Sequence, residues 1–386
     1  MKSVRLGVIG LGNIGRRYTD DVLTGKIARC QLTALCTRSA EKLASYSLAR
    51  QFTRSEDLIR SRSVDAVLIA TPHYSHTTIG IDALQNDLHV LVEKPISVHK
   101  ADCERLLAAH KNPRLVFAAM FNKRTDPAYL KLREMIQNGE LGEIRRINWI
   151  ITDWFRSEAY YASGGWRATW DGEGGGVLLN QCLHNLDLFQ WLFGMPQRVR
   201  GFCGLGRYHN IEVEDDVTAY CEYVNGATAV LISSTGEAPG TNRLEIAAEN
   251  GRLVLENNEL VFAKNDIPMS EFSRTTDKQF SAPSTTEFRL AFPDRGGQHV
   301  AVLQNFIDAI LDGQPLIAPA AEGIHSVELA NAIVFSSAHN QTVELPLDAV
   351  AYEQFLKNCV ANSRHHKKAT PFQPGSAADF TNSFGR

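Results

Sequence analysis

The run RLGVIGLGNIG at residues 5–15 decides the fold of the first part of the chain. Its mostly apolar residues 5–9 are typical of a buried β-strand, and glycines follow at once at positions 10, 12 and 15. In this GxGxxG spacing the first glycine permits a tight turn, the second lets the backbone approach a pyrophosphate, and the third allows close helix–strand packing. A helix that begins here points its N–H groups at the anion. The predicted dinucleotide-binding residues are Gly10, Gly12, Asn13, Ile14 and Gly15.

The residues after the next apolar run bear on which dinucleotide is bound. Residues 31–36 form the second expected strand, and Thr37, Arg38 and Ser39 follow it. An acidic residue at this point would bind the ribose of NAD, and none is present. Arg38 would attract a 2′-phosphate, and Thr37 could donate a hydrogen bond to it. We expect NADP or NAD as the cofactor, with NADP favoured; the alternative is that Arg38 points to solvent.

Short apolar runs alternate with helical patterns through the first 120 residues. Helical patterns at 79–84 and 101–110 separate the later runs. This alternation implies right-handed crossovers and a parallel sheet covered on both faces, so the fold class of this part is α/β, a Rossmann sheet. The expected strands are residues 5–9, 31–36, 64–70, 89–93 and 115–119.

The pattern changes after about residue 122. A helical stretch leads into long alternating strands, and Asn-Gly pairs at 225–226 and 250–251 are hairpin signals. We predict an α+β domain with a large, open, mostly antiparallel sheet that has one exposed face. The expected domains are 1–121, 122–350, and a C-terminal helix with a loose tail at 351–386. The expected elements of the second domain are helices at 129–138, 300–311 and 324–338 and strands at 144–150, 217–223, 227–233, 243–247 and 252–256.

Charge and composition restrict the kinds of partner. The 386 residues include 40 basic and 43 acidic ones, a net charge of −3, which argues against a strongly basic nucleic-acid binder. No apolar run approaches the ~20 residues that cross a bilayer, and the N-terminal residues lack the pattern of a signal peptide. The seven cysteines form no CxxC pair and show no zinc-site spacing. We expect a cytoplasmic protein with reduced cysteines and with no metal, nucleic-acid or membrane partner.

A lysine follows the fourth expected strand, in the sequence Glu93-Lys94-Pro95. Ligands of parallel sheets bind beyond the carboxyl ends of the strands, so Lys94 could reach a substrate hydroxyl there. On position alone, a surface lysine is the better interpretation.

A histidine lies in a second candidate stretch, GGGVLLNQCLHNLD at residues 174–187. A helix over these residues places Asn180, His184, Asp187 and Trp191 on one polar face, opposite an apolar face. The His184 imidazole suits proton transfer near neutral pH. The alternative is a solvated helix face or a structural histidine.

Taken in order along the chain, these motifs resemble the glucose-fructose oxidoreductase, inositol dehydrogenase and MocA family. The resemblance runs from Arg5 to about Leu347. It implies a sugar, inositol or nucleotide sugar bound between a Rossmann domain and an open-sheet domain, and a homo-oligomer, dimer or tetramer, formed through the C-terminal sheet. It also implies that Lys94 polarises the reacting oxygen and that His184 is the general acid/base. The motifs are the glycine loop, residues 71–76, Glu93-Lys94-Pro95, residues 174–187 and Glu214-Asp215-Asp216. The further cofactor-binding residues that it implies are Thr71, Pro72, His73, His76, Glu93, Lys94 and Asn122.

One position departs from the family's pattern. Many members have Asp four residues before the histidine, and this chain has Asn180. An amide can hydrogen-bond a hydroxyl but does not take a proton at neutral pH, so proton transfer falls on His184, assisted by Lys94. Some members that oxidise the C3 hydroxyl of a pyranose also have Asn here, which favours C3 oxidation.

Residues 152–170 are dense in aromatic and guanidinium groups, with tryptophans at 154, 166 and 170. Aromatic rings stack on the apolar faces of sugars, while Arg and Asp bind hydroxyls. Packing or subunit contact is the alternative interpretation. The expected substrate-binding residues are Asp153, Tyr160, Trp166, Arg167, Asn180 and His184, with His299 and Arg243 as weaker candidates.

These features predict an NAD(P)-dependent oxidoreductase that moves a hydride between the nicotinamide and a ring hydroxyl of a sugar or glycoside, with the C3 hydroxyl favoured. His184 would take the hydroxyl proton, and Lys94 would stabilise negative charge on the oxygen. One alternative is redox-neutral glycoside cleavage by a tightly bound nucleotide, through oxidation, elimination and re-reduction. Another is a non-catalytic ligand-sensing protein, which the presence of both Lys94 and His184 disfavours.

Overall fold

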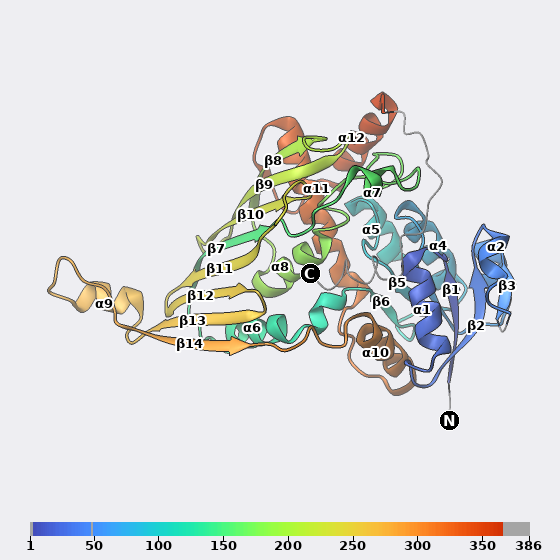
Figure 1. Ribbon diagram of the computed structural model, residues 1–386, viewed down its shortest axis with the longest axis horizontal. Coiled ribbons are helices and arrows are strands. Elements are labelled where there is room, and N and C mark those ends of the chain that lie inside the picture. The colour runs from blue at the N-terminus through green and yellow to red at the C-terminus, as the bar shows by residue number, and fades with distance from the viewer. Residues whose placement is uncertain (1–2, 48, 366–386) are drawn as a thin grey trace.

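The computed structural model describes residues 3–47 and 49–365, and the first of its two sheets is parallel and six-stranded (Figure 1). The strand order β3-β2-β1-β4-β5-β6 confirms the predicted Rossmann sheet. The short edge strand β3 was not expected, because three residues are too few to show a pattern. The strands are β1 (Val4–Ile9), β2 (Cys30–Cys36), β3 (Arg50–Phe52), β4 (Ala66–Ile69), β5 (His89–Val92) and β6 (Phe117–Ala119).

Helices from two distant parts of the chain cover this sheet. The helices between its strands are α1 (Asn13–Leu23), α2 (Ala40–Leu43), α3 (Ser55–Ile59), α4 (Tyr74–Gln85) and α5 (Lys100–Ala108). A later helix, α10 (Gln298–Asp312), packs Val302, Leu303 and Phe306 into one apolar cluster with the residues of β1. The sequence pattern assigned this helix to the second domain, and its packing partner is the first sheet. The division of the chain at 121 and 350 stays a prediction.

The second sheet has nine strands in the order β14-β13-β12-β11-β7-β10-β9-β8-β15. Only β7 and β10 pair in parallel, so the mostly antiparallel sheet is confirmed. Both hairpin signals mark turns, at Gly226 with φ +84° and Gly251 with φ +139°. The strands are β7 (Ile144–Ile151), β8 (Arg198–Leu205), β9 (Glu214–Glu222), β10 (Thr228–Ser234), β11 (Asn242–Ala248), β12 (Gly251–Glu256), β13 (Glu259–Asn265), β14 (Thr285–Ala291) and β15 (Val343–Glu344).

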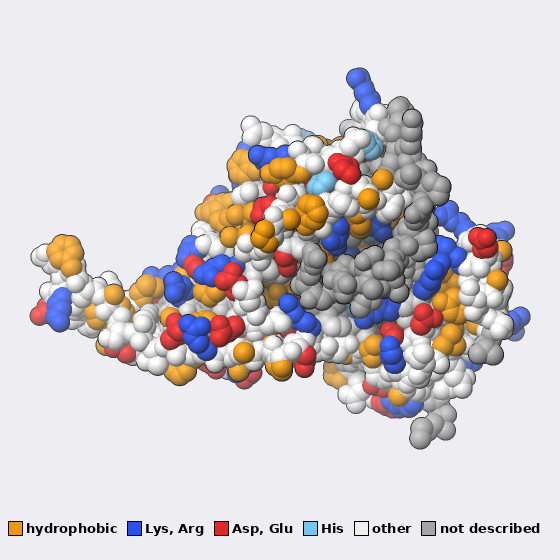
Figure 2. All heavy atoms as spheres, viewed as in Figure 1, with side chains coloured by type: hydrophobic (Ala, Val, Ile, Leu, Met, Phe, Trp, Pro, Cys, Tyr) orange, Lys and Arg blue, Asp and Glu red, His pale blue; other side chains and the backbone are white. Residues whose placement is uncertain are grey.

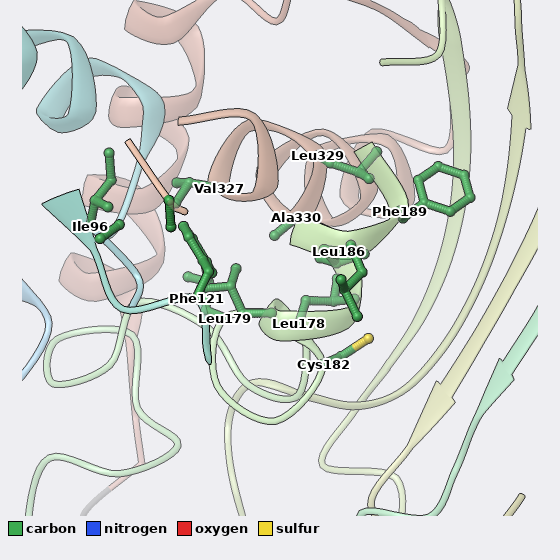
Figure 3. Close-up of a cluster of buried hydrophobic side chains, with 14 of the residues drawn as sticks. Ile96, Phe121, Leu178, Leu179, Cys182, Leu186, Phe189, Val327, Leu329 and Ala330 are labelled. Carbon is green, nitrogen blue, oxygen red and sulfur yellow. The ribbon is translucent and has the colours of Figure 1, made fainter. Parts of the chain in front are cut away.

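One face of this sheet is covered by helices and the other is not. The apolar cluster in Figure 3 shows how: Leu186 and Phe189 of α8 (Leu183–Phe193) lie against Leu329 and Ala330 of α11 (Gly323–His339). On the uncovered face, hydrophobic side chains gather over β8 to β10 (Figure 2). The remaining elements are η1 (Asn122–Thr125), α6 (Pro127–Gln137), α7 (Glu158–Ala162), α9 (Met269–Thr275), η2 (Ala320–Glu322) and α12 (Ala349–Asn362).

The end of the chain is only partly described. Helix α12 occupies the start of the segment that we expected to hold a C-terminal helix and a tail. Residues 366–386, most of the expected tail, lie outside the described residues. Within the described ranges, no helix combines the length and the apolar composition needed to cross a membrane. All seven cysteines are described and are free thiols.

Candidate active site

The glycine loop between β1 and α1 has the geometry that a dinucleotide requires. Gly10 has φ +102°, and a Cβ there would lie 2.4 Å from the carbonyl oxygen of Ala70. A Cβ on Gly15 would lie 1.8 Å from the carbonyl oxygen of Gly10. Around Gly12, in contrast, no atom lies within 4 Å of the position of a Cβ. Gly10 and Gly15 are thus needed for close packing, and Gly12 leaves open space where a pyrophosphate would approach.

The start of α1 fits an anion. Its N-cap, Gly12, makes no side-chain hydrogen bond, and the first turn, which begins with Asn13 and Ile14, has no acidic residue. The N–H groups of this turn are therefore available, and the helix dipole favours a negative charge. The residues present fit a dinucleotide. At the end of the neighbouring strand β2, Thr37 is half-buried and Arg38 is exposed.

The turns after β4 and β5 are joined by His76. Its Nδ1 lies 2.7 Å from the carbonyl oxygen of Pro95, and its Nε2 lies 2.8 Å from that of Thr71. The imidazole is fully buried and holds the two turns together. His73 is also buried and faces the carbonyl oxygen of Glu173 at 3.2 Å. Thr71 and Pro72 are half-buried at the same edge, and their contact with a cofactor stays a prediction.

Glu93 and Lys94 occupy the carboxyl end of β5, as the sequence predicts. The Glu93 carboxylate accepts hydrogen bonds from the Tyr18 hydroxyl of α1 and from the Lys94 backbone N–H. Burial raises the pKa of Glu93, and burial lowers the pKa of Lys94. The Lys94–Pro95 peptide bond is cis.

The Lys94 ammonium reaches the second candidate stretch. Its Nζ donates to the backbone oxygen of Asn180 at 2.9 Å and to the side-chain oxygen Oδ1 at 3.3 Å. The other end of the Asn180 amide donates to the carboxylate of Glu173. Two stretches 86 residues apart therefore meet at one point.

The predicted helix over residues 174–187 is partly wrong, because α8 begins only at Leu183. The first residues of this stretch are held against Glu214, at the start of β9. The Glu214 carboxylate accepts the backbone N–H groups of Gly176 at 2.8 Å and Leu178 at 3.1 Å, and its carbonyl oxygen accepts that of Val177. The N–H of Cys182 then bonds the carbonyl oxygen of Val177, five residues back, so the α-helical pattern is interrupted before α8.

His184 lies in the first turn of α8 and is buried. Its Nδ1 is buried and has no hydrogen-bond partner among the described residues. Burial lowers the pKa of His184 well below its usual value, and the nearby charges of Lys94 and Lys123 lower it further. At neutral pH the imidazole is therefore uncharged and able to accept a proton.

Lys123 is a site residue that the sequence interpretation missed. Its Nζ donates to Asn185 Oδ1 at 3.1 Å and lies 5.0 Å from the centre of the Trp154 ring. A usable signal was available, because Lys123 follows β6 and so stands beyond the carboxyl end of another parallel strand. His299 of α10 lies near Tyr18, whose hydroxyl donates to Glu93: the centres of the His299 and Tyr18 rings are 5.9 Å apart.

The predicted polar face of α8 is not solvated, and Asp187 belongs to the core. Asp187 accepts from the buried guanidinium of Arg124 at 2.6 and 2.8 Å, and both side chains are at most 1% exposed. Trp191 packs against the guanidinium of Arg133, 3.9 Å from the ring centre. This face of α8 therefore packs against η1 and α6, the two elements that follow β6.

The aromatic segment gathers around the hydroxyl of Tyr160. This oxygen accepts from Arg167 at 2.9 Å, from Gln181 at 3.0 Å and from the Asn180 amide at 3.3 Å. Trp166 lies beside it: the Arg167 guanidinium is 4.6 Å from its ring centre. Tyr160, Trp166 and Arg167 therefore lie together with Asn180, as their assignment to one site requires.

Asp153 and Asn122 each keep one buried oxygen that no described residue binds. The other Asp153 oxygen accepts from Asn242 at 3.1 Å, and the Asn122 amide donates to Gln298 at 2.6 Å. Asp153 lines a cavity of about 180 Å³ beside β11.

Arg243, a weaker candidate, lies away from the site. It pairs with Glu245 and Glu256 on the uncovered face of the sheet, opposite the buried Leu244. The described residues contain no group of three or more His, Cys, Asp or Glu side chains that could hold a metal ion.

Comparison with known proteins agrees with this geometry. Residues 4–121 match the family model described as an oxidoreductase family with an NAD-binding Rossmann fold, and residues 129–254 match the GFO/IDH/MocA C-terminal domain. Inositol 2-dehydrogenase of Corynebacterium glutamicum is 25% identical over 340 residues, 83% of this chain and 89% of that protein. Levoglucosan dehydrogenase of Pseudarthrobacter phenanthrenivorans is 24% identical over 395 residues, 90% and 99% of the two chains.

A solved structure shares the fold. The WlbA dehydrogenase from Bordetella pertussis, in complex with NADH and UDP-GlcNAcA, aligns with a TM-score of 0.74 at 23% identity, over 90% of this chain and all of that one. The two matched ranges together contain every strand from β1 to β11. They also contain the glycine loop, Lys94 and His184. The chain belongs to the GFO/IDH/MocA family of oxidoreductases, with an NAD-binding Rossmann fold.

Proposed function

We propose that this protein is a sugar dehydrogenase that oxidises the C3 hydroxyl of a pyranose or glycoside. The observation that carries the proposal is the meeting of Lys94, Asn180 and His184 beyond the carboxyl ends of the parallel strands, on the same side of the sheet as the glycine loop. One donor for the reacting oxygen and one uncharged base are what removal of a hydride and a proton requires.

The chain's own residues divide the work as follows. The first turn of α1 holds the pyrophosphate, and the nicotinamide, when bound, supplies the acceptor for the hydride. The Lys94 ammonium donates to the substrate oxygen and stabilises its developing negative charge. The uncharged imidazole of His184 accepts the hydroxyl proton. Loss of one hydride and one proton converts the CH–OH group to a ketone.

A sugar fits the residues around this point. The relatives are named for inositol and for levoglucosan, and both are ring polyols. Trp166 offers an aromatic face, Arg167 and the Tyr160 hydroxyl offer polar groups, and Asp153 keeps a buried oxygen for a hydroxyl donor. Asn180 at the position before the histidine favours C3 among the ring carbons.

NADP is the preferred dinucleotide in this proposal. Arg38 is exposed just beyond β2, and Thr37 stands beside it, so both are free to bind a 2′-phosphate. No acidic residue stands there to repel the phosphate.

A homo-oligomer formed through the uncovered face of the nine-stranded sheet completes the proposal. Several neighbouring residues over β7, β9 and β10 on this face are apolar: Ile232 pairs with Ile150, and Val230 pairs with Tyr220. Phe202 of β8 is 55% exposed and lies in register with Ile232, since both pair with Thr218. Hydrophobic side chains gather over β8 to β10 in Figure 2. Sedimentation velocity is expected to give a dimer or tetramer, and a Val230→Glu variant a smaller species.

The test is turnover with a panel of pyranosides, levoglucosan and myo-inositol, each with NADP⁺ and with NAD⁺. Reduction of the product with borodeuteride marks the carbon that became a ketone. Deuterium at C3 is the expected result, and deuterium at another carbon would refute the C3 assignment. A His184→Ala variant should lose turnover with every substrate of the panel.

Redox-neutral glycoside cleavage is separated from this proposal by the nucleotide. The cleaving mechanism retains its dinucleotide, so denaturing the purified protein would release a near-stoichiometric amount. The dehydrogenase proposal expects a protein that exchanges its dinucleotide with solution and releases little of it. A ligand-sensing protein would show no turnover, and Lys94→Ala would then change none of the activities measured.

A further inference from the structure

Glu173 is a buried carboxylate in direct contact with the proposed catalytic group. It lies in the tight turn before the three glycines and is 2% exposed. One oxygen accepts the backbone N–H of Ala168 at 2.6 Å, and the other accepts the side-chain amide of Asn180. A buried carboxylate is costly unless donors or cations compensate it. For Glu173 the compensating groups belong to the candidate site: the Asn180 amide and the charges of Arg167 and Lys94.

The hydrogen bonds leave the Asn180 amide only one orientation. Only its oxygen can accept from the Lys94 ammonium, and only its NH2 group can donate to the Glu173 carboxylate. The ammonium and the carboxylate therefore select the same orientation of the amide. Without the Glu173 carboxylate the Lys94 ammonium would still face the amide oxygen, but the NH2 end would lose its charged acceptor and the amide would be held less firmly.

Charge gives Glu173 a second effect on Lys94. Burial lowers the pKa of Lys94, and the negative charges of Glu93 and Glu173 act against this, while Arg167 and Arg156 add to it. Removing Glu173 would leave only Glu93 to offset burial and the two arginines. The other titratable groups whose protonation the Lys94 charge influences are the imidazoles of His73, His76, His184 and His299.

We propose that Glu173 is a positioning residue for the reaction: through the Asn180 amide it orients the group that holds Lys94, and with Glu93 it keeps Lys94 an ammonium ion. This inference rests on the proposed function, in which Lys94 donates to the reacting oxygen. Asn180 cannot ionise, so the negative charge on its side of Lys94 comes from Glu173, one hydrogen bond further away.

The test measures Lys94 directly and needs neither substrate nor dinucleotide. Acetic anhydride acetylates only the neutral amine, so the acetylation rate of Lys94, followed by peptide mass spectrometry across a pH series, reports how firmly the proton is held. In Glu173→Gln, Lys94 should be acetylated about fivefold faster or more at pH 8, because an opposite charge has been removed. Exposed Lys264 serves as the internal reference and should not change.

Two further variants keep the result interpretable. Glu212→Gln is the matched control, since Glu212 also accepts a backbone N–H of this turn, that of Trp170, and does not contact Lys94 or Asn180. Asn180→Asp combined with Glu173→Gln exchanges the carboxylate and the amide. This exchange should return the Lys94 rate to the wild-type value or below it.

The outcomes separate the two proposals. If Lys94 in Glu173→Gln, folded as judged by its melting curve, is acetylated at the wild-type rate, the positioning role is refuted even if the enzyme oxidises sugars. If Glu173→Gln does not fold, the exchanged variant decides: fast acetylation there contradicts the role. A protein with the expected acetylation pattern and no turnover would refute the proposed function and leave the Glu173–Asn180–Lys94 arrangement standing.

Discussion

The ammonium nitrogen of Lys94 lies 2.9 Å from the backbone carbonyl oxygen of Asn180, which joins the end of β5 to the stretch that leads into α8. This contact brings the dinucleotide-binding sheet and the helix that carries His184 to one point. A substrate oxygen placed there would meet a donor from one half of the molecule and a base from the other.

Replacing Lys94 separates chemistry from cofactor binding. We expect Lys94→Ala to lower kcat by about 100- to 1000-fold, the usual effect of removing a donor to a developing negative charge. Dinucleotide affinity should change much less, because in the proposed function Gly12 and the first turn of α1, not Lys94, bind the pyrophosphate. Steady-state kinetics and calorimetric titration measure the two quantities. Lys264→Ala is the control, because the Lys264 side chain is exposed on β13. An equal loss in both quantities would assign Lys94 to binding.

Arg38 decides the choice between dinucleotides in this account. Arg38→Ala should weaken NADP binding by about tenfold and leave NAD binding nearly unchanged, because only NADP has the phosphate that the guanidinium would bind. Calorimetric titration with each dinucleotide checks this. Arg62→Ala is the matched control, because Arg62 is also exposed but lies beside Arg5, near the amino-terminal end of β1. Equal effects on NADP and NAD would mean that Arg38 does not contact the phosphate.

The ion pair of Arg124 and Asp187 makes a prediction about stability. Asp187→Ala leaves a buried guanidinium without its main partner and should cost about 3–5 kcal/mol of unfolding free energy. The exposed pair of Arg5 and Asp65 is the comparison, and Asp65→Ala should cost about 1 kcal/mol or less. Urea unfolding measures both. Similar losses for the two variants would show that the core pair is not specially important.

Buried histidines predict that the protein loses stability in acid. Burial lowers the pKa of His299 to about 3, with further lowering by Arg17 and Lys94. The unfolded chain takes up a proton below about pH 6.5 and the folded chain does not, so stability is present above that pH and falls as the pH is lowered. Between pH 7 and pH 5, His299 should account for about 2 kcal/mol.

Urea unfolding at the two pH values tests this, with His299→Gln as the variant. The difference in unfolding free energy between pH 7 and pH 5 should be smaller in the variant. An unchanged difference would mean that His299 is protonated in the folded protein at pH 5.

Sequence patterns predicted those parts of the fold that depend on near neighbours. The strand before Gly10 and the turns at Gly226 and Gly251 are set by a few adjacent residues, and all three are confirmed. The start of α8 was not predictable in this way, because Glu214, 38 residues after Gly176, holds the backbone of the preceding stretch against β9. Strand β14 was missed, although Phe288 and Leu290 alternate with Glu287 and Arg289; all seven of its residues are exposed, so this alternation does not mark a buried face.

The site was predictable where the residue follows a parallel strand and unpredictable where a distant side chain completes it. Lys94 stands at such a strand end, whereas the helical spacing that the sequence suggests between Asn180 and His184 does not hold, because α8 begins at Leu183. Asp187 does lie one helical turn after His184, but Arg124, from the segment after β6, buries it. The role of Glu173 depends on the fold of the turn that brings its carboxylate to the Asn180 amide, seven residues later.

The most direct test of the central claim follows the hydride itself. The protein is mixed with NADP⁺ or NAD⁺ and with pyranosides that carry deuterium at C3. Mass spectrometry then measures the deuterium content of the reduced dinucleotide. The account predicts one deuterium for each dinucleotide reduced by the wild-type protein, and almost no reduction by Lys94→Ala or His184→Ala. Failure to bind either dinucleotide, or reduction without transfer of deuterium, would contradict it.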